Sequence, residues 1–235
     1  MLFEWNDQTI RWYKDASAYT GFHNALARRI LPYLESGDSL LDAGCGLGRI
    51  DMEIAAHVSA ITAIDYNAYV LQALLRDLES SAIENLAVRL EDVSGLKDSY
   101  DVILMSFFGN PDMPFFLEHC RRRIIRIVSA GYESSLYPKQ HRRNFKETVP
   151  AVREELAAWR IGYKLELCSI EFGQPLMNRR DAELYVLKNA PEASMEEVGR
   201  FLDESIILTG RDDFPIYIPY EKKLGIFVID KEATL

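Results

Sequence analysis

The glycine-rich stretch from Leu40 to Ile50 constrains this chain more than any other. It reads Leu-Leu-Asp-Ala-Gly-Cys-Gly-Leu-Gly-Arg-Ile, so two apolar residues lead into an acid and three alternating glycines before an amphipathic segment begins. This order is typical of a buried strand, a tight turn and the start of a helix. Glycine lets the backbone adopt positive φ and approach a ligand closely, and a helix start presents unpaired N–H groups. The stretch therefore predicts a site for a nucleotide-like ligand.

Strand and helix patterns alternate on both sides of this loop. The predicted strands are Ser39–Ala43, Ala60–Asp65, Leu86–Leu90, Tyr100–Phe108, Ile124–Ala130, Tyr163–Phe172 and Leu224–Ile229. The predicted helices cover roughly 20–31, 50–58, 68–78, Pro114–Arg123, Ala151–Ile161, 179–189 and 195–208, with Asn67, Asn178 and Ser194 as N-terminal caps. This alternation predicts an α/β fold with a doubly wound, mostly parallel sheet. Its ligands bind in a crevice at the carboxyl ends of the strands, where we expect the glycine loop, Asp65, Asp92 and Ser106 to converge.

Composition and charge exclude several classes of protein. The net charge is −9 and the isoelectric point is about 5.1, which argues against binding to nucleic acid through its phosphates. The apolar runs are far shorter than the ~20 residues of a membrane span, and the first residues lack the pattern of a signal peptide. Cys45, Cys120 and Cys168 are far apart and form no CxxC pair, which favours a reducing compartment and no metal site. We therefore expect a cytoplasmic protein.

The spacing of the glycines bears on the ligand. The dinucleotide fingerprint is GxGxxG, whereas here Gly48 follows Gly46 one residue too early for that pattern. Asp42 lies two residues before the first glycine, where its charge would repel a pyrophosphate but would suit a cationic ligand. A cationic ligand is favoured over a pyrophosphate, and a nicotinamide-dependent oxidoreductase stays as an alternative.

At these residues the sequence resembles the class I S-adenosylmethionine-dependent methyltransferases. Leu40–Gly48 resembles the family's first motif, in which an acid precedes GxGxG. Asp65 matches the acid that binds the ribose hydroxyls, Asp92 the acid that contacts the adenine amine, and Tyr100–Phe108 the strand whose end faces the transferred methyl group. The resemblance implies a Rossmann-like methyltransferase fold, a seven-stranded sheet with an antiparallel last strand, and S-adenosyl-L-methionine as the cofactor, with S-adenosyl-L-homocysteine as the product.

The residue chemistry and the resemblance together give a set of predicted cofactor contacts. They are Asp42, Gly44, Cys45, Gly46, Gly48, Asp65, Tyr66, Asp92, Val93 and Ser106. Alternatives stay open at three of these positions. Asp42 could instead brace the loop, Glu91 could replace Asp92 while the Val93 N–H meets the adenine, and Tyr66 could be an exposed turn residue rather than a platform for the adenine ring.

The chain shows no repeat or linker, so we predict a single methyltransferase domain over residues 1–235. Residues 1–36 form an N-terminal helical lid whose aromatic side chains either pack on the domain or cover a ligand. Residues 37–130 form the cofactor-binding half. Residues 131–235 form the substrate-side half, in which a helical insertion at 179–208 serves dimerisation or substrate capture. The sequence is compatible with a monomer and with a homodimer.

The methyl acceptor is less constrained than the cofactor. Methyl transfer is an in-line displacement that depends mainly on orientation, and a base is needed only for a protonated nucleophile. The fourth strand lacks the Asn/Asp-Pro-Pro-Tyr/Phe sequence of the enzymes that methylate nucleic-acid amines, which favours an oxygen or nitrogen of a small molecule. We take His23 as the candidate base, with Tyr13 and Tyr19 as alternatives. Candidate acceptor contacts are Tyr13, Tyr19, Phe107, Arg142 and Arg143. A protein that binds S-adenosylmethionine without catalysis is the alternative.

Overall fold

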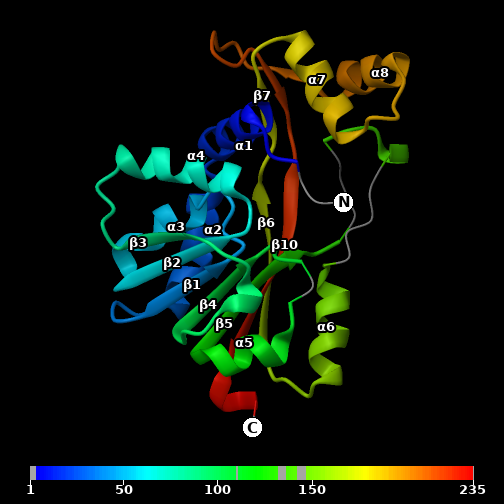
Figure 1. Cartoon of the computed structure of the whole chain (residues 1–235). Helices are drawn as coiled ribbons and strands as arrows, with labels where there is room; N and C mark the ends of the chain where they lie inside the picture. Colours follow the sequence, from blue (N-terminus) through cyan, green and yellow to red (C-terminus); the bar gives the residue numbers. More distant parts are fainter. Residues whose placement is uncertain (1–3, 110, 132–135, 142–146, 235) are drawn as a thin grey trace.

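A seven-stranded sheet in the order β3-β2-β1-β4-β5-β10-β6 forms the centre of the molecule (Figure 1). The computed structural model describes residues 4–109, 111–131, 136–141 and 147–234. The strands are β1 Ser39–Ala43, β2 Ala60–Asp65, β3 Leu86–Leu90, β4 Tyr100–Ser106, β5 Cys120–Ser129, β6 Lys164–Glu171 and β10 Glu221–Asp230. Neighbours from β3 to β5 are parallel, and β10 is antiparallel to both β5 and β6. The predicted doubly wound sheet with a reversed last strand is confirmed.

Helices cover both faces of this sheet. They are α1 Asp7–Thr20, α2 Phe22–Ile30, α3 Arg49–Ile54, α4 Ala68–Glu79, α5 Met113–His119, α6 Val149–Ala158, α7 Arg179–Asn189 and α8 Met195–Ser205, with short 3₁₀ turns at Leu31–Tyr33, Ala55–His57, Val93–Gly95, Lys139–His141 and Lys231–Thr234. Alternate residues of β4 point to opposite faces. Val102 and Leu104 pack with α2 and α3, whereas Ile103 and Met105 pack with α5 and α6. The buried strands thus read as continuous apolar runs.

A smaller unit joins α1 to the segment between β6 and β10. Its three short strands are β7 Gln174–Leu176, β8 Ile207–Leu208 and β9 Ile216–Ile218, in the order β7-β9-β8. Side chains from α1, α7, α8 and these strands share one hydrophobic cluster. Sequence analysis predicted both helices, but it continued the second one to residue 208, where the structure has β8. It missed the three strands because runs of two or three residues carry no clear alternation. Figure 1 shows α7 and α8 at the end of the molecule opposite the C-terminus.

The carboxylate of Asp181 connects this insertion to α1. Asp181 is buried near the start of α7 and accepts a hydrogen bond of 3.0 Å from the indole N–H of Trp12. It also pairs with Arg11, and the side chain of Gln174 donates to the backbone carbonyl of Trp12 at 3.1 Å. The insertion is therefore held against α1 by charged and neutral hydrogen bonds as well as by apolar contact.

The predicted helix caps are present at all three positions. The side chain of Asn67 accepts from the backbone of the first turn of α4, and that of Asn178 accepts from Asp181 in α7. Ser194 and Glu197 form a capping box at the start of α8. These local signals were readable because a cap satisfies N–H groups within three residues of itself.

The predicted helix Pro114–Arg123 is too long. Helix α5 ends at His119, and Cys120 begins strand β5, which pairs with β4 through Arg123 and the residues after it. The arginines at 121–123 therefore lie at the start of a strand and not at the end of a helix. Their charges are balanced by carboxylates of β4, β10 and the turn before β1 and not by a helix dipole.

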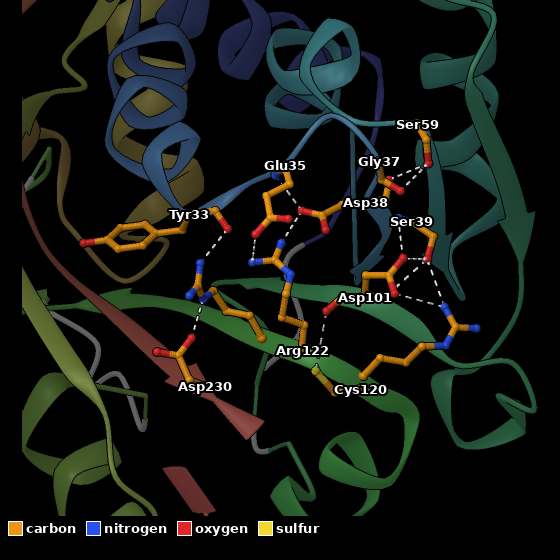
Figure 2. Close-up of polar contacts among 12 residues, drawn as sticks. Tyr33, Glu35, Gly37, Asp38, Ser39, Ser59, Asp101, Cys120, Arg122 and Asp230 are labelled. Atoms are coloured by element: carbon orange, nitrogen blue, oxygen red, sulfur yellow. Dashed lines mark hydrogen bonds and ion pairs between the residues drawn. The ribbon is translucent and has the colours of Figure 1, made fainter. Parts of the chain in front are cut away.

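Figure 2 shows the partners of these arginines at the amino ends of the parallel strands. The ion pairs join Arg121 to Asp101, Arg122 to Glu35 and Asp38, and Arg123 to Asp230, and Arg123 also donates to the carbonyl of Tyr33. This edge of the sheet is opposite the glycine loop. The basic residues at 121–123 are thus part of the scaffold.

A substitution at Gly225 in β10 tests how closely α6 packs on the sheet. A Cβ atom at this position would lie 2.1 Å from Cγ2 of Val149, whereas a Cβ atom at Gly37 would meet nothing within 4 Å. We expect Gly225→Ala to lower the free energy of unfolding by about 1–3 kcal/mol through overpacking. The control Gly37→Ala should change it by less than ~0.5 kcal/mol. Urea unfolding measures both, and equal effects of the two changes would contradict this packing.

Candidate functional site

A cavity of about 610 Å³ lies at the carboxyl ends of the central strands. Predicted site residues that line it are Tyr13, His23, Asp42, Gly44, Cys45, Gly46, Asp65, Ser106 and Phe107. On the other side, Trp5 comes from the segment before α1, Trp12 from α1, Gln174 from β7 and Tyr185 from α7. The cavity is thus enclosed between the sheet edge, the N-terminal helices and the insertion.

The backbone of the glycine loop is fitted closely to its surroundings. Gly44 has φ +74°, and a Cβ atom on it would lie 2.7 Å from the ring of Phe108. Gly48 has φ +58°, and a Cβ atom there would lie 2.6 Å from Leu74 of α4. Both positions combine a left-handed backbone with a close contact, so both require glycine. Gly48 serves the packing of the loop and does not line the cavity.

The Asp65 carboxylate is fixed at the edge of the cavity by two backbone N–H groups. Gly46 N–H donates to Oδ2 at 3.0 Å, and Asn67 N–H donates to Oδ1 at 2.8 Å. An ionised carboxylate offers about four acceptor positions, so each oxygen keeps capacity for a further donor. Asp65 can therefore accept two hydroxyl groups of a ligand while it holds the glycine loop in place.

Asp42 and Asp51 form a buried pair of carboxyl groups behind the loop. Asp42 ends β1 and Asp51 lies in α3, and each interacts with the side chain of the other. Burial raises the pKa of Asp42 well above its usual value, and the negative charge of Asp51 raises it further. Burial raises the pKa of Asp51 to about 7. Two adjacent carboxylates cannot both ionise at low cost, so the pair shares a proton.

His23 lies in the wall of the cavity with both ring nitrogens engaged. Ser17 Oγ is 2.7 Å from Nδ1, and the Tyr13 hydroxyl is 3.0 Å from Nε2. Burial lowers the pKa of His23 to about 3, and the positive charges of Lys222 and Arg49 act in the same direction. The imidazole is therefore neutral at physiological pH, and its hydrogen bond orients the Tyr13 hydroxyl.

Four of the other predicted residues that the structure describes do not line the cavity. Tyr66 is 58% exposed, and Asp92 caps its own turn by accepting from Ser94 N–H at 2.9 Å. Val93 packs against the hydrophobic cluster under α5 and α6. Tyr19 stacks on Tyr217 with ring centroids 4.9 Å apart. Arg142 and Arg143 lie outside the described residues.

Sequence analysis missed several residues that complete the cavity. Phe172 and Gln174 follow β6, Tyr185 belongs to α7, and Lys222 lies near the start of β10. No local motif marks them. One signal was available for Lys222, since a reversed last strand begins at the edge where the parallel strands end.

Comparison with known proteins agrees with this architecture. Residues 40–125 match a family model described as a methyltransferase domain. No curated protein matches the sequence. Among solved structures, the YcgJ protein from Bacillus subtilis is similar with a TM-score of 0.54 at 13% identity, over 89% of this chain and 97% of that one. A putative methyltransferase from Bacillus halodurans C-125 has a TM-score of 0.55 at 12% identity, over 88% and 98%.

A third similar structure holds the cofactor. The magnesium protoporphyrin IX methyltransferase from Synechocystis PCC 6803, with bound S-adenosylmethionine, has a TM-score of 0.50 at 12% identity, over 97% of this chain and 86% of that one. These likenesses concern the fold, and the family match concerns the segment that holds the glycine loop, Asp65 and Asp92. The chain thus has the Rossmann-like fold of the methyltransferases it resembles, and its residues 40–125 match a methyltransferase domain.

The shared proton of Asp42 and Asp51 gives a testable pH dependence. Because the pKa of Asp51 rises from 3.8 to about 7, the folded protein retains a proton that the unfolded chain releases. The free energy of unfolding should therefore fall between pH 4 and 7, by up to ~1.4 kcal/mol per pH unit. Asp51→Asn removes this carboxyl group and its contribution, whereas Asp42, whose pKa is raised mainly by burial, keeps its own, so we expect a shallower fall. Urea unfolding of both proteins across this range measures it, and parallel pH curves would contradict a shared proton.

Proposed function

We propose that this protein transfers the methyl group of S-adenosylmethionine to an oxygen or nitrogen atom of a small molecule. One observation carries the proposal: a single cavity adjoins the glycine loop and Asp65 on one side and an aromatic wall on the other. Its volume is within the ~300–1,000 Å³ of small-molecule sites. Such a cavity suits a cofactor and a compact acceptor better than a strand of nucleic acid.

The cofactor contacts are proposed from the geometry of the loop. Asp65 accepts the two ribose hydroxyls, and the backbone of Gly44, Cys45 and Gly46 approaches the methionyl part of the cofactor. Asp42, at the end of β1, stabilises its positive charge through the ionised form of the shared pair. Ser106 and Phe107, at the end of β4, lie where the methyl group faces the acceptor.

The adenine end of the site is proposed from the resemblance alone. Asp92 and Val93 follow β3, at the edge where the adenine ring of such a cofactor lies, and Tyr66 follows the ribose acid. None of the three lines the cavity before a ligand binds, so their contact requires the ligand to extend along the sheet edge past Asp65. Gly48 contributes by holding the loop against α4.

The division of the chain into a lid, a cofactor-binding half and a substrate-side half also stays a proposal. It is supported by α1, whose Trp12 and Tyr13 line the cavity, and by the insertion, whose Tyr185 lines the same cavity. We therefore assign the insertion at 179–208 to substrate capture rather than to dimerisation. A cytoplasmic location and a monomeric or homodimeric state stay predictions from the sequence.

The names of similar structures do not decide the acceptor. They include a putative RNA methyltransferase from Pyrococcus horikoshii and the porphyrin methyltransferase described above, each at 14% identity or less. The net charge of −9 favours a small molecule over RNA, because RNA binding depends on neutralised phosphates. Tyr13 and Phe107 are the proposed acceptor contacts that line the cavity.

Asp65→Ala tests the cofactor site. Loss of a charged acceptor of hydrogen bonds costs about 1.5–3 kcal/mol, so we expect S-adenosylmethionine to bind roughly 10- to 100-fold more weakly. The control Asp98→Ala removes an exposed carboxylate of the same charge that pairs with Arg89 outside the cavity. Calorimetric titration measures the affinity, and an unchanged value in Asp65→Ala would exclude this site.

The same titration, extended to NADH and to product release, distinguishes the proposed methyltransferase from the two alternative functions. Binding of NADH without a response to S-adenosylmethionine would replace the methyltransferase by an oxidoreductase. Binding of S-adenosylmethionine without release of S-adenosylhomocysteine, in the presence of a metabolite library, would favour a protein that binds the cofactor without catalysis.

His23→Gln tests the role of the buried histidine. If His23 only orients the Tyr13 hydroxyl, glutamine should support that hydrogen bond, and we expect turnover within about tenfold of the original with an unchanged pH profile. A general base contributes about 10²–10⁴-fold. A loss of that size together with the loss of one limb of the pH–rate profile would restore His23 as the base. Release of S-adenosylhomocysteine measures the rate.

A further inference from the structure

The ammonium group of Lys222 lies in the cavity among aromatic rings. Its Nζ atom is 3.7 Å from the ring centroid of Phe107, 5.2 Å from that of Phe172 and 5.4 Å from that of Phe22. The faces of aromatic rings attract cations, which holds the side chain in one place. Phe107 itself has φ +55°, an uncommon backbone conformation for a bulky residue and one that clusters at functional sites.

Lys222 differs from the other cations of the cavity in its lack of a carboxylate partner. Arg49 pairs with Asp77 at 3.3 Å, and Lys188 pairs with Glu4. Within the described ranges, no Asp or Glu oxygen lies within ion-pair distance of Lys222. The side chain is partly buried, and removal of an ammonium group from water without a counter-charge is costly. This burial lowers the pKa of Lys222 to about 8. An anion bound beside it would offset that cost.

The position of Lys222 in the sheet separates it from the proposed cofactor contacts. Asp42 and Asp65 end β1 and β2, whereas β10 lies two strands beyond β4 in the other direction. Arg49 directly follows the glycine loop and therefore lies on the cofactor side of the cavity. Lys222 and Phe107 are thus on the side of β4 that faces the acceptor.

The side chains that line the cavity beside Lys222 indicate which chemical group accompanies the anion in the ligand. The rings of Phe172, Tyr13 and Tyr185 line the same cavity, and flat apolar surfaces of this kind suit an aromatic ligand through stacked or edge contacts. We propose that Lys222 binds a carboxylate of the methyl acceptor, and that the acceptor is a small aromatic acid. This inference rests on the proposed function and names the substrate class of the same site.

Matched pairs of charged and neutral probes test the inference. With the protein saturated with S-adenosylhomocysteine, calorimetry compares benzoate with benzamide, 2-naphthoate with 2-naphthamide, and indole-3-acetate with indole-3-acetamide. For at least one pair we expect the carboxylate to bind tenfold or more tightly than the amide. Lys222→Met should abolish the preference, and Lys222→Arg should retain part of it.

Lys223→Met is the matched control. Lys223 is the next residue of β10 and is exposed, so the change removes the same charge without altering the cavity. It should keep the full preference for the carboxylate. Thermal unfolding checks that the variants are folded, and Lys222→Gln replaces the methionine variant if that one fails to fold.

Three outcomes would overturn the inference. They are the absence of a carboxylate preference in every pair, a preference that persists without Lys222, and a tenfold loss of S-adenosylhomocysteine affinity in Lys222→Met, which would assign the lysine to the cofactor. Failure of the proposed function is distinct from all of these, because the unchanged protein would then bind neither S-adenosylmethionine nor S-adenosylhomocysteine.

Discussion

The parallel pairing of β1, β2 and β4 is the constraint on which the site depends. Because parallel strands end at the same edge, Asp65 and Ser106, which are 23 and 64 positions after Asp42, lie at the same edge of the sheet as Asp42. The hydrogen bond from Gly46 to Asp65 then fixes the glycine loop against the end of β2. The parallel pairing thus brings acidic and apolar residues that are distant in the sequence to the same edge of the sheet.

The charges of the cavity are separated along this rim. Asp42 and Asp65 lie on the side of β1 and β2, and Lys222 lies on the side of β10. A sulfonium cofactor with a positive charge suits the acidic side, and an anionic acceptor suits the basic side. Opposite signs at the two ends orient the two ligands relative to each other, and orientation is what an in-line methyl transfer needs most.

Local signals explain which features could be predicted from the sequence. The glycine loop, Asp65 and the caps at Asn67 and Asn178 each depend on a few neighbouring residues, so their patterns are complete within one short segment. The end of α5 was misplaced because arginines at 121–123 suit a helix terminus as well as a strand with carboxylate partners. Only the tertiary fold distinguishes those two environments.

The acceptor side could not be predicted because its contacts are long-range. Trp12 meets Asp181, which is 169 residues away, and Lys222 meets Phe107 from a strand at the other end of the chain. Pairing of this kind leaves no periodicity in the sequence, since each residue alone fits an ordinary helix or strand. The cofactor side of the site could thus be predicted from a local sequence motif, whereas the acceptor side is formed only by tertiary packing.

Tyr13 connects the two halves physically. Its ring contacts Trp5, which lies over Gly46 of the loop, and also Phe172, which lies beside Lys222. Its hydroxyl is held by His23, while α1 as a whole is tied to the insertion through Asp181. A displacement of α1 would therefore move the walls on both the cofactor and the acceptor sides together. Helix α1 contacts both the glycine loop and the insertion. The aromatic wall of the cavity is therefore complete only when both of these segments pack against α1.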